Sequence, residues 1–387
     1  MQRPSVLRGA ALFVGLAVCA CPSALLSRTL RDTSSQTSPQ PSTAREDADV
    51  ARLRQAADQG NAEAQFAIGV RYATGKGVVR DDAQAAGWIR KAADRGHIDA
   101  QFNLGLMYAD GNGVPQDSAQ AVAWLRKAAD QGDARAQSNL GLMYANGSGV
   151  ARDPAQAIAW YRKAAEQGEV SAQFSLGLTY ANGDGTRKDP AQAALWFRKA
   201  ADQGHALAQF NLALIYANGV GVPADPVQAA QWFRKAAEQG DVTSQFTLGV
   251  MYANGTGVAQ SDEQAVEWYR KAANQGLASA QTNLGPRYFS GRGVRQDPAQ
   301  AVLWFHKAAE QADASALFNL GVLYANGSGV APDAIEAYKW LSLAVDRSSG
   351  AEQKGYAEAR DTVAGVLTPQ HLAEAQARAR EWTERRK

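Results

Sequence analysis

The sequence predicts an all-α fold of the solenoid type, in which eight helical hairpins of 36 residues stack in a row. Three observations predict it. Glycine recurs every 36 residues from position 60 to position 276, and alanine takes the eighth place at 312. Tyrosine keeps the same period from 72 to 324, and tryptophan keeps it from 88 to 340. Within each period, apolar residues stand at helical spacing in two separate stretches, and no strand pattern interrupts them.

The chain begins with residues 1–20, which are predicted to form a secretory signal peptide. Two arginines precede the apolar run Gly9–Ala20, which is too short to span a membrane comfortably. Two processing routes remain. The sequence Val-Cys-Ala-Cys at 18–21 resembles a loose bacterial lipobox, in which Cys21 would carry a lipid; simple cleavage after Ala20 is the alternative. Either route predicts a secreted protein, in the periplasm or attached to the outer membrane of a Gram-negative bacterium.

Both cysteines of the chain lie at the end of this segment, so the repeats cannot depend on disulfides. Residues 21–46 are rich in serine, threonine, glutamine and proline, which predicts a disordered linker. Residues 47–60 end like the second helix of a repeat and are expected to form an N-terminal capping helix. Eight repeats follow, at 61–96, 97–132, 133–168, 169–204, 205–240, 241–276, 277–312 and 313–348. Residues 349–387 are expected to form a C-terminal helical cap.

Each repeat is expected to contain a first helix, helix A, and a second helix, helix B. In the second repeat Ala100, Leu104 and Tyr108 stand four apart on one face of helix A, and Trp124 and Ala128 do so on helix B. Helix A ends at Gly-x-Gly turns, and Asp-Pro begins helix B in four repeats. Glycine in the middle of helix A weakens a helix, so its recurrence indicates a helix contact without room for a side chain.

Composition and motifs argue against several function classes. The net charge is only +2, which speaks against a nucleic-acid partner. No two of the four histidines have metal-ligand spacing, and no serine-hydrolase, β-lactamase or zinc-protease motif occurs. His97 and His205 occupy the first repeat position and are interpreted as helix-start residues. The Arg-Lys pairs of helix B are interpreted as a solvated face with local ion pairs. We therefore expect no metal, no cofactor and no catalytic residue.

The repeat is identified by three stretches of its second copy. Ala-Gln-Phe-Asn-Leu-Gly-Leu-Met-Tyr-Ala (100–109), Gly-x-Gly-Val (111–114) and Ala-x-x-Trp-x-Arg-Lys-Ala-Ala-x-x-Gly (121–132) resemble the Sel-one-like repeat, a relative of the tetratricopeptide repeat. The resemblance covers about residues 47 to 345. It implies a right-handed α/α superhelix whose helices A line a concave groove that binds protein segments. Members of this family act mostly as adaptors, so the resemblance leaves the partner undefined.

Helix A carries the candidate binding residues. Asparagine recurs just before the core leucine, as Asn103, Asn139, Asn211, Asn283 and Asn319. In tetratricopeptide relatives an asparagine at the matching position holds the ligand backbone, and an amide suits that role because it both donates and accepts. A structural bond inside the repeat is the alternative. Phenylalanine precedes three of these asparagines, as Phe102, Phe210 and Phe318, and is interpreted as partly buried packing rather than as an exposed docking strip.

The seventh repeat departs from the others. Pro286 lies inside helix A, where it removes a backbone hydrogen bond and predicts a local bend. Arg287 stands where methionine or isoleucine is usual. Arg287 is therefore a candidate specificity residue of the groove, with sequence drift in one copy as the alternative.

Together these features predict a non-catalytic protein–protein interaction scaffold of the bacterial cell envelope, which binds a protein or peptide in the helix A groove. The rival interpretation is an enzyme that acts on cell-wall or β-lactam compounds. That interpretation comes from cysteine-rich secreted relatives, a few of which are linked to penicillin binding, and this chain lacks their cysteines.

Overall fold

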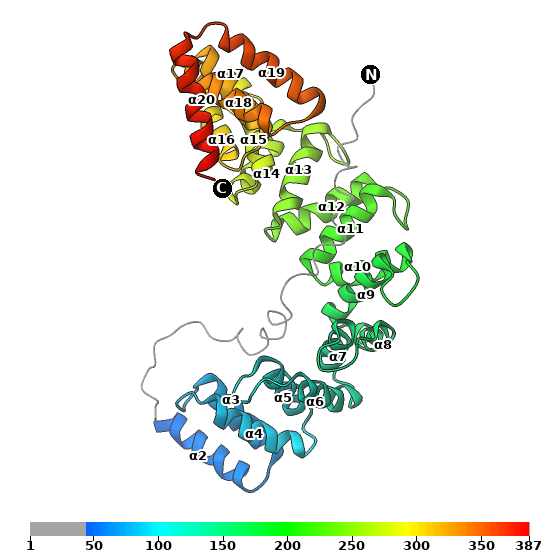
Figure 1. Cartoon of the computed structure of the whole chain (residues 1–387). Coiled ribbons are helices and arrows are strands. Elements are labelled where there is room, and N and C mark those ends of the chain that lie inside the picture. The colour runs from blue at the N-terminus through cyan, green and yellow to red at the C-terminus, as the bar shows by residue number, and fades with distance from the viewer. Residues whose placement is uncertain (1–43, 387) are drawn as a thin grey trace. The chain divides into compact units, whose positions relative to one another are not determined.

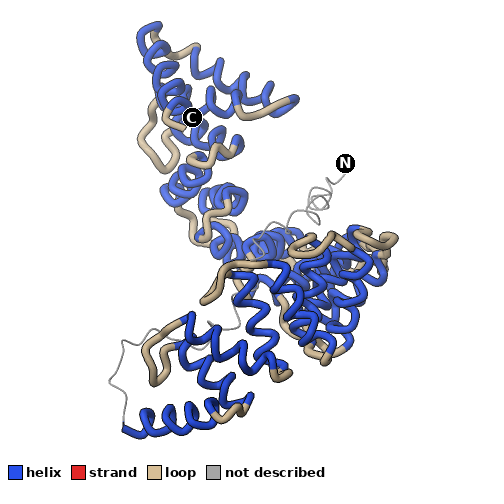
Figure 2. The backbone as a smooth tube through the Cα atoms, turned by 60° about the horizontal axis from the view of Figure 1, so that its bottom comes forward, coloured by secondary structure: helices blue, strands red, loops and turns tan. Residues whose placement is uncertain are grey.

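The structure is a computed structural model that describes residues 44–386. This part of the chain contains nineteen helices and no strand, so the predicted all-α class is confirmed (Figure 2). The predicted signal peptide, most of the predicted linker and Cys21 lie outside the described residues.

The helices follow the predicted alternation of helix A and helix B. The helices A are α3 (Ala62–Thr74), α5 (Ile98–Asp110), α7 (Ala134–Asn146), α9 (Val170–Asn182), α11 (Ala206–Asn218), α13 (Val242–Asn254), α15 (Ala278–Ser290) and α17 (Ala314–Asn326). The helices B are α4 (Asp82–Asp94), α6 (Ser118–Asp130), α8 (Pro154–Glu166), α10 (Pro190–Asp202), α12 (Pro226–Glu238), α14 (Asp262–Asn274), α16 (Pro298–Ala309) and α18 (Ala334–Asp346). Three further helices flank the repeats, namely α2 (Ala44–Asp58), α19 (Gly350–Ala364) and α20 (Pro369–Glu384).

Contacts divide the chain into two compact units at residues 223 and 224. In the first unit each helix from α2 to α11 packs against its neighbours in the chain, as Figure 1 shows. In the second unit α12 to α19 do the same, and α20 returns to pack against α18. Packing restricted to nearest neighbours is the property that defines a solenoid, so each unit has the predicted repeat architecture.

Local capping explains why the helices begin where they do. Aspartate caps seven of the eight helices B, where its carboxylate accepts a hydrogen bond from a first-turn backbone N–H, as Asp153 does from Gln156. His97 and His205 cap α5 and α11 in the same way, each accepting through Nδ1 from the N–H three residues later at 3.2 Å. The interpretation of both histidines as helix-start residues is therefore confirmed.

The turn from helix B to the next helix A requires a left-handed backbone. The seven glycines from Gly60 to Gly276 have φ between 87° and 96°, which costs glycine no steric strain. Ala312 takes the eighth place with φ of 60°, and no other non-glycine residue in the described chain has a positive φ. The fold therefore keeps this turn even where the sequence departs from glycine.

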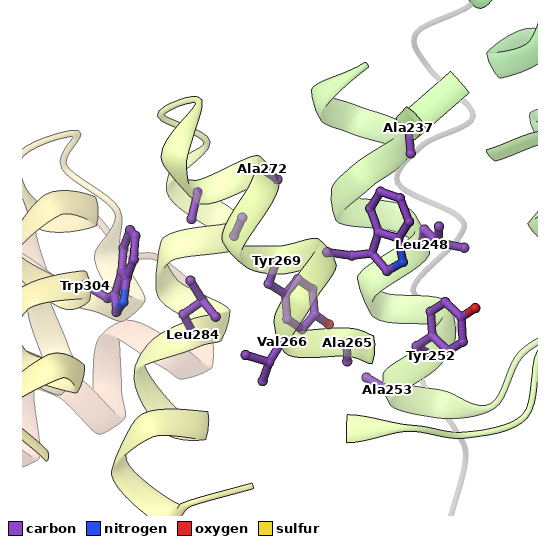
Figure 3. Close-up of a cluster of buried hydrophobic side chains, with 13 residues drawn as sticks. Ala237, Leu248, Tyr252, Ala253, Ala265, Val266, Tyr269, Ala272, Leu284 and Trp304 are labelled. Carbon is purple, nitrogen blue, oxygen red and sulfur yellow. The ribbon is translucent and has the colours of Figure 1, made fainter. Parts of the chain in front are cut away.

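The core forms where a large helix B side chain meets the glycine of helix A. Figure 3 shows such a cluster in the second unit, with Tyr269 of α14 lying among Leu248, Val266 and Ala265. A Cβ atom placed on Gly249 would lie 2.7 Å from Cδ1 of Tyr269. Five other mid-helix glycines in the row meet a leucine, tyrosine or phenylalanine at 2.2 to 2.7 Å, and Gly69 meets an isoleucine at 2.7 Å. The predicted contact without room for a side chain is thus present.

Candidate functional site

The five asparagines of helix A occupy the same position on α5, α7, α11, α15 and α17. In each, Nδ2 donates to the backbone carbonyl four residues earlier in the same helix, at 2.7 or 2.8 Å. Asn103 and Asn211 are buried, Asn139 and Asn319 are half-buried and Asn283 is exposed. Within residues 44–386 no donor bonds to their Oδ1 atoms, so each amide is held by its nitrogen while its oxygen stays unused.

The phenylalanines beside the asparagines are packed to different degrees. Phe102 is 2% exposed, and the guanidinium of Arg135 lies 4.5 Å from its ring centroid. Phe318 is half-buried and stacks on Tyr356 of α19 at 4.4 Å between ring centroids, and Phe210 is also half-buried. Phe174, at the same position of another repeat, stacks on the ring of a capping histidine at 4.5 Å. These contacts are those of partly buried packing.

In the seventh repeat Pro286 lies within α15, which continues as one helix to Ser290. The predicted bend stays a prediction. The side chain of Arg287 is 13% exposed, and its guanidinium pairs with Asp262 of α14 at 2.5 Å. Arg292 binds the other carboxylate oxygen of Asp262 at 2.7 Å. Hydrogen bonds from Arg292 and Arg287 lower the pKa of the Asp262 carboxyl. Arg287 and Arg292 of the seventh repeat thus bind the same carboxylate, that of Asp262 in the preceding repeat.

The sequence interpretation missed a row of buried glutamines on helix A. Gln101, Gln137, Gln173, Gln245 and Gln281 are 3 to 5% exposed. Their Nε2 atoms donate to a backbone carbonyl of the preceding helix B at 3.0 to 3.2 Å. Their Oε1 atoms accept from a second glutamine, 30 residues later, at 2.7 to 3.0 Å. We call this arrangement the glutamine ladder. Its sequence signal was the recurrence of glutamine at this position in seven of the eight repeats, with Leu317 in the eighth.

The Arg-Lys pairs lie on a solvated face, as interpreted, since all six lysines are exposed, but the expected local ion pairs are missing from most of this row among the described residues. The arginines of the first six repeats donate to the tyrosine hydroxyl of the next helix A, as Arg162 does to Tyr180 at 2.8 Å. The lysines of these pairs lie over the neighbouring tryptophan rings at 3.6 to 4.1 Å from the centroids. Only Lys271 among these described lysines pairs with a carboxylate, that of Glu267. Cation–π contact therefore replaces ion pairing on this face.

The described residues contain no cluster of histidine, cysteine or acidic side chains that could hold a metal ion. No helix among residues 44–386 is both long and apolar enough to cross a membrane. Burial lowers the pKa of His205, and burial together with Lys339 lowers the pKa of His306. Both imidazoles are engaged, His205 as a helix cap and His306 with the hydroxyl of Tyr324 at 3.2 Å.

Comparison with known proteins finds the same repeat family by sequence and by structure. The family model described as Sel1 repeat matches eight consecutive segments, residues 62–97, 98–133, 134–169, 170–205, 206–241, 242–277, 278–313 and 314–349. A crystal structure of a Sel1 repeat protein from Oxalobacter formigenes is 34% identical, with a TM-score of 0.59, over 85% of this chain and 99% of that one. No curated protein matches the sequence significantly.

A second similar structure is a protective antigen present in uropathogenic Escherichia coli strains, which displays the same repeat fold. It is 32% identical, with a TM-score of 0.54, over 87% of this chain and 94% of that one.

Proposed function

This chain belongs to the Sel1 repeat family, and we propose that it is a non-catalytic scaffold that binds a protein or peptide segment along its helix A faces. The observation that carries this proposal is the repeated asparagine with its nitrogen bonded inside the helix. That bond fixes the side chain and leaves Oδ1 as an acceptor of constant orientation. An extended peptide offers backbone N–H donors at regular intervals, which a row of such acceptors suits. Both interpretations of the asparagine, structural and binding, can therefore hold at once.

The proposed location is the cell envelope. It rests on the signal peptide expected at residues 1–20, with Cys21 as the lipid-bearing residue in one of the two processing routes. Cell fractionation and mass measurement of the mature N-terminus test this directly. A mature chain that begins at Cys21 with added lipid mass indicates membrane attachment, and one that begins at Cys21 without it indicates a free periplasmic protein. An unprocessed chain in the cytoplasm would remove the location from the proposal.

Site-specific photo-crosslinking in the native host tests the binding surface. A photoreactive amino acid replaces Asn139 or Asn319 on helix A, and the matched controls carry it at Ala123 or Gln231, which are exposed on helix B. We expect a discrete crosslinked protein from the helix A positions and none from the helix B positions. Equal crosslinking from both faces, or crosslinking from helix B alone, would contradict the assignment of the surface.

The enzyme alternative makes a different prediction for the same protein. An enzyme that acts on β-lactams through a covalent intermediate would become labelled by a fluorescent penicillin with one label per chain. We expect no stoichiometric label. Covalent labelling that a single serine substitution abolishes would replace the scaffold proposal with an enzymatic one.

A further inference from the structure

The glutamine ladder has one incomplete step, in the first repeat. Gln65 of α3 is 3% exposed, and its Nε2 donates to the carbonyl of Ala57 at 3.0 Å, as in the other repeats. Its Oε1 atom is buried and has no hydrogen-bond partner among the described residues. Burying an acceptor without a donor is unfavourable, so this oxygen is a place where a ligand donor would gain free energy.

The missing donor has a single cause in the sequence. In the second repeat Gln131 is the glutamine that donates to the ladder, and the matching position of the first repeat is occupied by Arg95. The Nε of Arg95 donates to the carbonyl of Gly60 at 2.9 Å, which reproduces the bond from Gln131 to Gly96. The Gln65 oxygen receives nothing from Arg95, whereas Gln131 donates to Gln101 at 2.7 Å. The arginine therefore keeps one of the two ladder bonds and leaves the other open.

A pocket of about 360 Å³ lies at this open step. Its lining is small and highly charged: Ala57, Asp58, Gln65, Lys91, Asp94 and Arg95. Two carboxylates and two cationic groups surround one unpaired amide oxygen, so the pocket has opposite charges and no net charge of its own. All four charged side chains belong to exposed residues, so the charged part of the pocket faces solvent, whereas the Gln65 oxygen is itself buried.

Five of the six lining residues recur in the second repeat with the same identity. Ala93, Asp94, Gln101, Lys127 and Asp130 stand 36 residues after their counterparts. Only the arginine differs, since glutamine replaces it at 131. The chain therefore contains its own matched control for the effect of this one residue.

We propose that this pocket binds a small zwitterion of the amino-acid class, with its ammonium on Gln65 and its carboxylate on Arg95. An ammonium supplies the donor that the Gln65 oxygen lacks, and Asp58 and Asp94 compensate its positive charge. A carboxylate complements the guanidinium and the ammonium of Lys91. A purely cationic ligand would face Lys91 and Arg95 uncompensated, and a purely anionic one would face the two aspartates. The site is separate from the asparagine row and does not depend on the proposed scaffold function.

Titration calorimetry on the full chain tests the proposal with glycine and diglycine as probes, and with methylammonium and acetate as the two halves of glycine. We expect a zwitterion to bind with one site per chain and each half to bind at least about tenfold more weakly. Binding of glycine identifies a free amino acid as the ligand class, and binding of diglycine alone identifies the ends of a short peptide. Absence of binding by both zwitterions would overturn the proposal.

Two reciprocal variants separate the role of Arg95 from general effects on folding. Arg95→Gln supplies the ladder donor to Gln65, so we expect an intact fold and at least about tenfold weaker binding. Gln131→Arg opens the second step and should raise the stoichiometry to two sites per chain. Thermal melting by circular dichroism checks that both variants fold. Unchanged affinity in Arg95→Gln, or one site in a folded Gln131→Arg, would show that the open ladder step does not make the site.

Discussion

The close approach between helices A and B gives a quantitative test of the repeat packing. In the fourth repeat a Cβ atom on Gly177 would lie 2.5, 2.6 and 2.9 Å from three ring atoms of Phe197. Real Cβ atoms essentially never come so close to another atom. Phe197 is 1% exposed, so its ring cannot swing into solvent to make room. Gly177→Ala therefore forces the two helices apart.

Two opposing effects set the size of the change. Replacing a helical glycine by alanine stabilises a helix by about 1 kcal/mol. Overpacking a rigid core by one methyl group costs about 1 to 3 kcal/mol. Ala213 occupies the same repeat position and is fully buried, which shows that this repeat architecture can accommodate a methyl group there. We therefore expect Gly177→Ala to lower the free energy of unfolding by about 1 kcal/mol.

A second glycine provides the matched control. Gly87 lies inside α4, and a Cβ atom there would have no atom within 4 Å. Gly87→Ala should give the helix effect alone, a gain of about 1 kcal/mol. Urea denaturation followed by tryptophan fluorescence compares the midpoints of both variants with that of the parent. In a repeat protein the midpoint reports the affected stretch of repeats rather than a single global transition.

A double-mutant cycle with Phe197→Leu identifies the cause. Leucine occupies the facing position in the second repeat, where Leu125 meets Gly105. The smaller and more flexible side chain should reduce the cost of Gly177→Ala, so the two changes should be less harmful together than their sum. If Gly177→Ala stabilises the protein as much as Gly87→Ala, the packing argument is wrong.

Three further predictions concern polar contacts. Burial lowers the pKa of His205, so the folded state binds fewer protons than the unfolded state, and stability should fall as the pH drops below about 6.5. His205→Asp keeps the helix cap and should remove this part of the pH dependence of the urea midpoint. An unchanged pH slope in the variant would contradict this prediction. Tyr180→Phe removes the hydroxyl that accepts from Arg162 and should lower the free energy of unfolding by about 1 kcal/mol in urea denaturation, and no change would mean that water replaces the bond fully. Asp262→Asn leaves the guanidinium of Arg287 without its counter-charge and should lower the free energy of unfolding by about 1 to 3 kcal/mol at neutral pH. The difference between variant and parent should shrink in acid, because the parent carboxyl then protonates through its lowered pKa. An equal difference at low pH would point to a steric cause.

The repeat architecture could be predicted because its signals are local. Asp-Pro pairs begin helices, and glycines with positive φ end the hairpins, since these residues satisfy or relieve the backbone within a few positions. Apolar residues such as Leu104 and Tyr108 stand at helical spacing inside each period, so the sequence alone indicates which face of each helix is apolar. The mid-helix glycine predicted a close helix contact, although its partner side chain could not be named.

The candidate site was only partly predictable. The asparagine row was visible as a recurrence, but an amide at one position suits a bond in its own helix and a bond to a ligand equally well. The structure decided that Nδ2 bonds to the carbonyl four residues earlier. For Arg287 the sequence showed an unusual residue and its deviation from the repeat, while its partner Asp262 stands 25 positions away on another helix.

By itself the sequence determined the period, the helices and the caps of this protein, because capping and amphipathic spacing act over one or two helical turns. Only the tertiary structure decided which polar side chains meet. The Arg–Tyr bonds join residues 18 positions apart, and the steps of the glutamine ladder join residues 30 positions apart. The stacking of neighbouring helices brings these residues together in space, and no local sequence pattern encodes such contacts. The open step at Gln65 is therefore visible only in the folded chain. Arg95 removes a hydrogen bond between two helices without changing either helix.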